Sequence, residues 1–189
     1  MEYVYRLNLP GFNEILNPNF SLSDCFGNEY IKSPPVKEWL RPEWHNFKNL
    51  DWTTRSVLLR FAPGTANQIH IDNPTLEDTR CWWGINWIIG NGGTNFWTRD
   101  QISSSEIITD TSGYKRPKLT MSGPPIKNYK TVHNGVYLIY AYEPHSAYND
   151  INATSDRIAI CTRPDFLSPL TPKTWEEVVE LFKDLIIDY

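Results

Sequence analysis

The sequence of 189 residues has little cysteine and no long apolar run, and both shortages exclude whole classes of protein. Its cysteines, Cys25, Cys81 and Cys161, are odd in number and far apart. This argues against a disulfide framework or a zinc ribbon and favours reduced thiols in the cytoplasm. The most apolar stretch, CWWGINWIIG at 81–90, is too short to cross a bilayer as a helix. The stretch MEYVYRLNLPGFNEIL has no continuous apolar core, so we expect no secretory signal there.

Clustered positive charge is also missing, although the formal net charge is only −4. Without a run of lysines and arginines, the sequence argues against a nucleic-acid partner or a membrane surface. A hydrophobic fraction of 40% with 21% charged residues is typical of a folded, soluble chain. No repeat or flexible linker divides it. We therefore expect one domain over residues 1–189, with an irregular N-terminal segment (1–52), a core (53–163) and a C-terminal helix (171–188).

From residue 53 onward the chain consists of short β-rich runs separated by turn residues. Examples are TTRSVLLRFA, QIHID, CWWGINWII, TNFWT, VYLIYAY and DRIAICTR, interrupted by PG, NP, GNGG and HNG. The run VYLIYAY is apolar on both faces, as expected for a strand buried inside a sandwich. This texture predicts a mainly β protein with an antiparallel sandwich or barrel, and GNGG at 90–93 predicts a hairpin turn.

The remaining segments predict fewer regular elements. A short helical turn is expected around VKEWL at 36–40. Near the C-terminus, Thr174 and Glu177 have the spacing of a capping box, and apolar residues follow at helical intervals. Residues 109–130 are polar and rich in turn formers. They are expected to form either a plain surface loop or a mobile cover over a site.

The stretch QIHIDNP at 68–74 carries the first candidate for chemistry. In an extended chain His70 and Asp72 point to one face and the two isoleucines to the other. Two residues of strand span roughly 6.6 Å, so both polar side chains could reach one metal ion. The alternative is a strand end whose polar face simply meets solvent.

The second candidate is EPHSAYNDINATSDRIAICTR, residues 143–163. Turn formers between His145 and Arg157 predict that the chain reverses and brings the two side chains close together. An arginine that opens an apolar strand needs a partner, because burying an unpaired guanidinium is costly. A small anionic ligand could be that partner, and so could a local acid such as Asp150 or Asp156.

Taken together, His70, Asp72 and His145 offer two imidazoles and one carboxylate, the facial triad suited to non-haem Fe(II). With the pattern His-x-Asp at 70–72 and His-Ser-x-x-Asn…Ser-Asp-x-Arg at 145–157, the chain resembles the Fe(II)- and 2-oxoglutarate-dependent dioxygenases. It is most similar to the branch of aspartyl/asparaginyl β-hydroxylases and related small hydroxylases. The resemblance covers about residues 53–163.

This resemblance implies a double-stranded β-helix, the jelly-roll or cupin-like fold. It implies that His70, Asp72 and His145 bind Fe(II) and that Arg157 pairs with the far carboxylate of 2-oxoglutarate. The implied reaction is hydroxylation of a peptide or small-molecule substrate, with formation of succinate and CO2. Many members carry a serine two residues after the arginine, where this chain has Ala159. Asn86, Thr94 or Asn95 would then replace that hydroxyl.

Two other interpretations remain open at this stage. One is a cupin-type metalloenzyme that uses the same triad without 2-oxoglutarate. The other is a non-catalytic jelly-roll module whose eight tryptophans stack on a ligand such as a sugar. The sequence identifies neither the substrate nor the oligomeric state.

Overall fold

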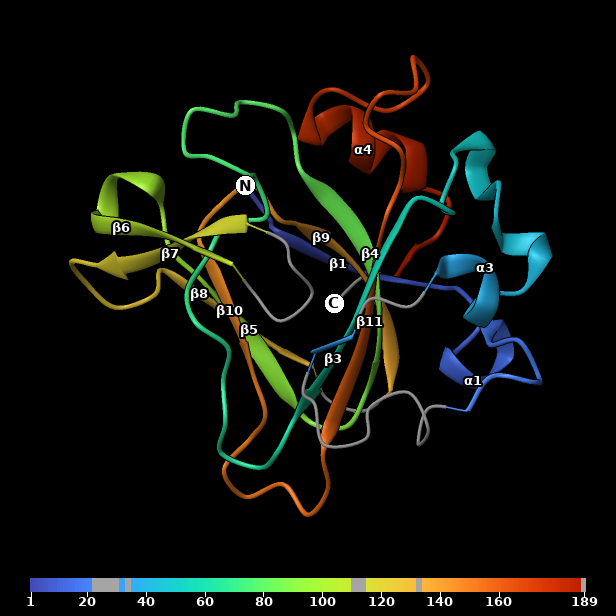
Figure 1. The fold of residues 1–189 in the computed structure, drawn as a ribbon, viewed down its shortest axis with the longest axis horizontal. Coiled ribbons are helices and arrows are strands. Elements are labelled where there is room, and N and C mark those ends of the chain that lie inside the picture. The colour runs from blue at the N-terminus through green and yellow to red at the C-terminus, as the bar shows by residue number, and fades with distance from the viewer. Residues whose placement is uncertain (22–30, 33–34, 110–114, 132–133, 188–189) are drawn as a thin grey trace.

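The structure is a computed structural model that describes residues 1–21, 31–32, 35–109, 115–131 and 134–187 (Figure 1). Within these ranges the chain is mainly β, and every strand pairing is antiparallel. The larger sheet has the order β12 (Ile186–Ile187), β1 (Val4–Leu7), β9 (Gly135–Tyr140), β4 (Trp83–Ile89), β11 (Arg157–Arg163), β3 (Arg55–Phe61) and β2 (Ile31–Lys32). The smaller sheet has the order β10 (His145–Tyr148), β5 (Gly92–Phe96) and β8 (Lys127–Thr131).

Residues 66–70 complete the smaller sheet along the free edge of β10. They do so through two isolated bridges, Ala66 to Tyr148 and His70 to His145. From β3 to β11 the chain alternates between the two sheets. The large sheet receives β3, β4, β9 and β11, and between them the small sheet receives residues 66–70, then β5 and β8, then β10. Two facing sheets connected in this way form a jelly-roll, so the predicted fold class is confirmed.

At the edge of the small sheet, β6 (Ile102–Thr109) and β7 (Lys115–Met121) pair with each other as antiparallel strands and are called the β6–β7 hairpin below. The prediction of a loop over 109–130 was therefore wrong for its described part, which contains β7 and β8. Leu119 donates a backbone hydrogen bond to Ile69, and Lys118 bridges His70, so β7 lies beside 66–70. Pro117 and the basic residues around it hide the alternation of β7 behind a polar composition, although β7 is paired on both sides and β6 is the outer strand.

The GNGG segment makes a corner rather than the predicted hairpin, because β4 and β5 belong to different sheets. Gly92 has a φ of +135°, in the region that favours glycine. A Cβ added there would lie 2.1 Å from the carbonyl oxygen of Tyr148 and 3.0 Å from Cδ of Arg157. Glycine at this position thus lets the start of β11 pass close beneath the corner.

Helices α1 (Phe12–Ile15), α3 (Val36–Trp39) and α4 (Trp175–Phe182) cover the outer face of the large sheet (Figure 1). The turns η1 (Pro42–Trp44) and η2 (Phe47–Asn49) lie in the same N-terminal part, and η3 (Arg99–Gln101) precedes β6. The main core lies between these helices and the sheet, with Trp39, Trp52, Trp83 and Phe182 at most 1% exposed. No helix in the described ranges is long and apolar enough to cross a membrane.

The two ends of the chain contribute more strand than the sequence suggested. The helix over VKEWL is confirmed, as is the capping box of Thr174 and Glu177. Helix α4 stops at Phe182, however, and the last apolar residues of the expected helix form β12. β12 pairs with β1, which in turn pairs with β9. The described parts of the segment 1–52 hold the short helices and turns named above, and its strands β1 and β2 extend the large sheet at its two sides.

Candidate metal centre

His70 and His145 face each other as one pair of the antiparallel small sheet. The amide of each donates to the carbonyl of the other, at 3.1 Å from His70 and 2.9 Å from His145. Residues opposite each other in such a pair project their side chains on the same face of the sheet. The two imidazole rings accordingly lie side by side, with centroids 4.5 Å apart. Backbone pairing alone therefore brings together two residues that are 75 positions apart.

Each imidazole is oriented by a backbone carbonyl two residues earlier. Nδ1 of His70 lies 2.7 Å from the oxygen of Gln68, and Nδ1 of His145 lies 2.9 Å from that of Glu143. With Nδ1–H donating to the carbonyl, the lone pair of Nε2 points toward the interior, the arrangement usual for metal-bound histidine. Burial lowers the pKa of His145 to about 3, with the neighbouring His70 adding to the effect. Both rings are therefore neutral at pH 7 and suitable as ligands.

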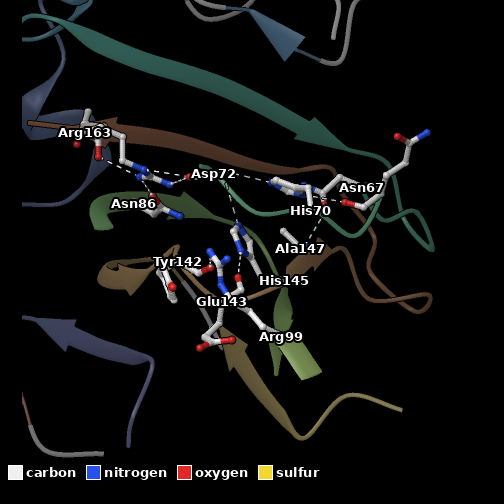
Figure 2. A network of polar contacts seen from close by, with 12 residues as sticks. Asn67, His70, Asp72, Asn86, Arg99, Tyr142, Glu143, His145, Ala147 and Arg163 are labelled. Carbon is white, nitrogen blue, oxygen red and sulfur yellow. Dashed lines mark hydrogen bonds and ion pairs between the residues drawn. The ribbon is translucent and has the colours of Figure 1, made fainter. Parts of the chain in front are cut away.

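Asp72 completes the group on the cavity side of the two histidines (Figure 2). Its Oδ1 lies 3.5 Å from Nε2 of His70 and 3.9 Å from Nε2 of His145. All three potential ligand atoms lie within 4.8 Å of one another. The sequence-based prediction that these residues converge on one point is confirmed. They form a group that could hold a metal ion.

Arg163 supports Asp72 from the side away from the histidines. Its Nη2 and Nε donate to Oδ2 of Asp72 at 2.7 and 3.2 Å (Figure 2). Burial by itself would raise the pKa of Asp72, but the charge of Arg163 holds it well below its usual value. The carboxylate is thus ionised, with Oδ2 taken by Arg163 and Oδ1 directed toward the histidines.

The sequence analysis missed Arg163, although a signal was present. Arg157, Ala159, Cys161 and Arg163 alternate along β11 and so share one face. Nη1 of Arg163 also donates to Oδ1 of Asn86 at 3.2 Å, which places Asn86 beside the Asp72–Arg163 pair. Its carbonyl oxygen is therefore engaged in supporting that pair.

Arg157, at the other end of the same face, has no such partner. It is only 1% exposed, and its Nε and Nη1 are buried without a hydrogen bond to any described residue. Burial lowers its pKa to about 10, so it remains charged at pH 7. The nearby Asp156 instead pairs with Arg60 at 2.6 Å. The alternative of a salt bridge from Arg157 to Asp150 or Asp156 is not found in the described part of the chain.

A cavity of about 560 Å³ between the two sheets connects these groups. All six predicted site residues line it, namely His70, Asp72, Asn86, Thr94, His145 and Arg157. Thr94 lies opposite Ala147 on the small sheet, and Ala159 contributes only its methyl group to the cavity wall. Asn95 is not among the described lining residues, and its Oδ1 accepts a hydrogen bond from Asn128.

The donor set fits a divalent transition metal. Two neutral imidazoles and one carboxylate supply three ligands on one side, and the open cavity lies on the other. This is the composition of the facial triad, which leaves further coordination positions for exchangeable ligands. The oriented Nδ1 atoms and the Arg163–Asp72 pair supply the outer contacts that such sites require.

Comparisons with known proteins add no family. No protein-family model and no curated protein matches the chain. Among solved structures, two of the capsular polysaccharide assembling protein CapF from Staphylococcus aureus align with it, and so does one of CapF with the inhibitor 3-isopropenyl-tropolone. Each shows 15% identity and a TM-score of 0.30, and the alignment covers 64% of this chain and 25–27% of CapF. A likeness this distant carries no argument about function, so the fold assignment rests on the strand order described above.

Proposed function

We propose that this protein is a non-haem Fe(II)- and 2-oxoglutarate-dependent oxygenase that hydroxylates a peptide or small-molecule substrate. The observation that carries the proposal is the buried, unpaired guanidinium of Arg157 in the same cavity as the His70–Asp72–His145 group. A triad alone fits many metalloenzymes. A triad with a second, buried anion-binding group fits a cosubstrate that bears both a metal-chelating end and a distant carboxylate.

The residues have distinct roles in this proposal. His70, Asp72 and His145 would hold the iron, which supplies the oxidising chemistry when bound together with oxygen and 2-oxoglutarate. Arg157 would form a bidentate pair with the far carboxylate and so fix the orientation of the cosubstrate. The sheets, with Phe96 and Ile139 packed against the site, would exclude water from the reacting groups. Arg163 would keep Asp72 ionised and correctly turned.

Because position 159 is alanine, another residue would have to donate the second hydrogen bond to the far carboxylate of 2-oxoglutarate. Since the methyl group of Ala159 cannot donate a hydrogen bond, a hydroxyl from the opposite sheet must assist Arg157. Thr94 lines the cavity and is only 4% exposed, whereas Asn86 is engaged with Arg163. Thr94 is therefore the better candidate of the two for the second contact to the far carboxylate.

The same alanine favours one alternative function. A cupin-type metalloenzyme would use the His70–Asp72–His145 group without 2-oxoglutarate, and it would need no hydroxyl at position 159. In that case Arg157 would bind an anionic substrate directly instead of a cosubstrate.

The test is an anaerobic titration of the Fe(II)-loaded protein with 2-oxoglutarate. The proposal expects a saturable charge-transfer absorption band, which reports bidentate chelation of the metal. Succinate, which lacks the keto group, should produce no band, and Asp72→Ala should produce none because iron is lost. Iron binding without any band on addition of 2-oxoglutarate would favour the cupin-type alternative. Failure to bind iron would favour a non-catalytic module.

A further inference from the structure

A second unpaired guanidinium, that of Arg116, lines the cavity on the side of the β6–β7 hairpin. Arg116 lies on β7, is partly buried, and its Nε is shielded from solvent without a hydrogen bond to any described residue. The other basic residues of this strand differ from it. Lys118 forms an ion pair with Glu106 at 3.9 Å, and Lys115 is exposed.

Strand pairing explains why Arg116 faces the site. Lys118 bridges His70 across the sheet, so the side chains of both residues project on one face. Arg116 lies two residues from Lys118 and therefore projects on that same face. Arg116 also lies close enough to His70 to affect its pKa, which is lowered first by burial and then by the positive charge of Arg116.

Arg116 and Arg157 lie on opposite sides of the candidate metal ligands. Because β7 is antiparallel to 66–70, Arg116 aligns with the Asp72 end of that segment. Arg157 lies beneath Gly92 and next to Tyr148, whose bridge partner is Ala66 at the other end. The six steps from Ala66 to Asp72 span roughly 20 Å if fully extended, more than the length of one small dicarboxylate. Arg116 therefore projects from the end of this segment that carries Asp72, and Arg157 lies toward the end that carries Ala66.

The described cavity wall contains no acid that could neutralise Arg116. Asp72 is the only carboxylate among the described lining residues, and Arg163 already pairs with it. A cavity with unpaired cations and no spare acid attracts anions and disfavours cationic ligands.

We propose that Arg116 is the binding residue for the substrate, which carries a carboxylate or phosphate group that pairs with this guanidinium beside the candidate metal centre. This inference rests on the proposed function, because the bound anion is a substrate only if the protein is an oxygenase. The anion site itself depends only on the cavity. The anionic end would be held at the hairpin, so the bond to be hydroxylated lies between that end and the metal.

The test follows the Arg116 side chain directly. In protein labelled with 15N-arginine and loaded with Zn(II) in place of iron, the Nε–H signal of Arg116 is assigned by its loss in Arg116→Gln. Inorganic phosphate and acetate are then titrated at constant ionic strength, with chloride as the balancing anion. We expect a saturable shift of this signal, and the anion that saturates it at lower concentration identifies the class. The dissociation constant of that anion should rise about tenfold or more in Arg116→Gln, since one charge-assisted pair is lost.

Lys115→Gln is the matched control, because it removes the same charge from the neighbouring, exposed position. It should leave the anion affinity within about twofold of the parent. Equal loss in both variants, or no saturable shift in the parent, would overturn the inference. So would loss of 2-oxoglutarate binding in Arg116→Gln with retention in Arg157→Gln, because Arg116 would then be the cosubstrate's partner. If 2-oxoglutarate never binds but Arg116 still responds to phosphate or acetate, the oxygenase proposal fails and the anion site stands.

Discussion

Strand β11 carries an arginine at each end of its cavity face, and the two arginines have opposite surroundings. Arg163 is 6% exposed and donates to Asp72, Asn86 and the carbonyl of Thr162. Arg157 is 1% exposed, and two of its three nitrogens are buried without a protein partner. The same residue type, on the same face of the same strand, is hydrogen-bonded through all three nitrogens at one end. At the other end it has two nitrogens without a hydrogen bond to any described residue, and it lies over the ring of Phe61.

The different surroundings of Arg163 and Arg157 indicate different roles for the two ends of β11. A buried charge without a partner is costly, so a folded chain retains one where a ligand completes the pairing. Arg163 is completed by the protein itself and supports a candidate metal ligand. In the proposed function, Arg157 binds an anion from outside the protein. The two ends would then separate support of the candidate metal ligand from binding of a cosubstrate, and each prediction below tests that separation.

The largest expected effect is a contrast in stability between Arg163→Met and Arg157→Met. Arg163→Met leaves Asp72 as a buried carboxylate without its guanidinium, which should destabilise the metal-free protein by about 3–5 kcal/mol. Arg157→Met removes a buried charge whose Nε and Nη1 have no hydrogen bond to any described residue and whose guanidinium lies 5.6 Å from the ring centroid of Phe61. The loss of that ring contact should destabilise by no more than about 2 kcal/mol, less than the loss in Arg163→Met. Urea unfolding of both variants, followed by tryptophan fluorescence, measures the contrast. Equal destabilisation would mean that Arg157 has a structural partner after all.

Acid should test the metal end of this contrast, because burial lowers the pKa of its two histidines in the folded protein. The pKa of His145 is lowered from 6.5 to about 3 in the folded protein, so the unfolded chain binds a proton between these two values and the folded chain does not. The free energy of unfolding of the metal-free protein must therefore fall as the pH drops below about 6.5. The total loss should be a few kcal/mol, at about 1.4 kcal/mol per pKa unit.

The measurement is urea unfolding of the metal-free protein at several pH values from 7 to 4. His145→Asn should give a shallower dependence on pH, because it removes one of the two histidines responsible. Above about pH 4 the carboxylate of Asp72 contributes little to the slope, since its pKa is depressed in the folded state. A parent protein whose stability is flat over this range would contradict the buried, neutral imidazoles.

A third test measures ligand binding at the Arg157 end. Arg157→Ala removes a charge-assisted bidentate pair and leaves the three metal ligands intact. The dissociation constant of 2-oxoglutarate should rise by about ten- to a hundredfold, and that of Fe(II) should barely change. Arg157→Lys should fall between, because lysine keeps the charge and loses the planar fork. Anaerobic absorption titrations measure both constants. An equal loss of iron affinity would show that the two ends are not separate.

The sequence predicted the unpaired end of β11 better than the paired one. His70, Asp72, His145 and Arg157 were found because alternation on a strand and the turn after Tyr148 are local features of the chain. Arg163 was missed because its partner, Asp72, follows residues 66–70 and is far from β11 in the sequence. Which arginine meets Asp72 depends on how the two sheets are stacked, and a single strand does not reveal this.

The β6–β7 hairpin was missed for a related reason. β6 is the exposed outer strand, and β7 pairs with β6 on one side and with residues 66–70 on the other. Their burial is partial and their composition is polar. Hydrophobic alternation is the main signal for a strand, and an edge strand weakens it. The loss matters for function, because Arg116 could not be placed at the cavity without the pairing of Lys118 and His70.

The smallest expected effect concerns Asp156, the acid next to Arg157 in the sequence. Asp156 pairs with Arg60, and both side chains are about one-third exposed, at 30% and 39%. Water screens such a pair, so Asp156→Ala should change the free energy of unfolding by less than about 1 kcal/mol. Asp156 lies just before β11 and is not among the described residues that line the cavity. The affinity for 2-oxoglutarate should accordingly stay within about twofold of the parent value, as measured by the same titration. If Asp156→Ala instead tightens binding about tenfold, Asp156 competes with the ligand for Arg157 in solution, and the contrast between the two arginines is smaller than their surroundings indicate.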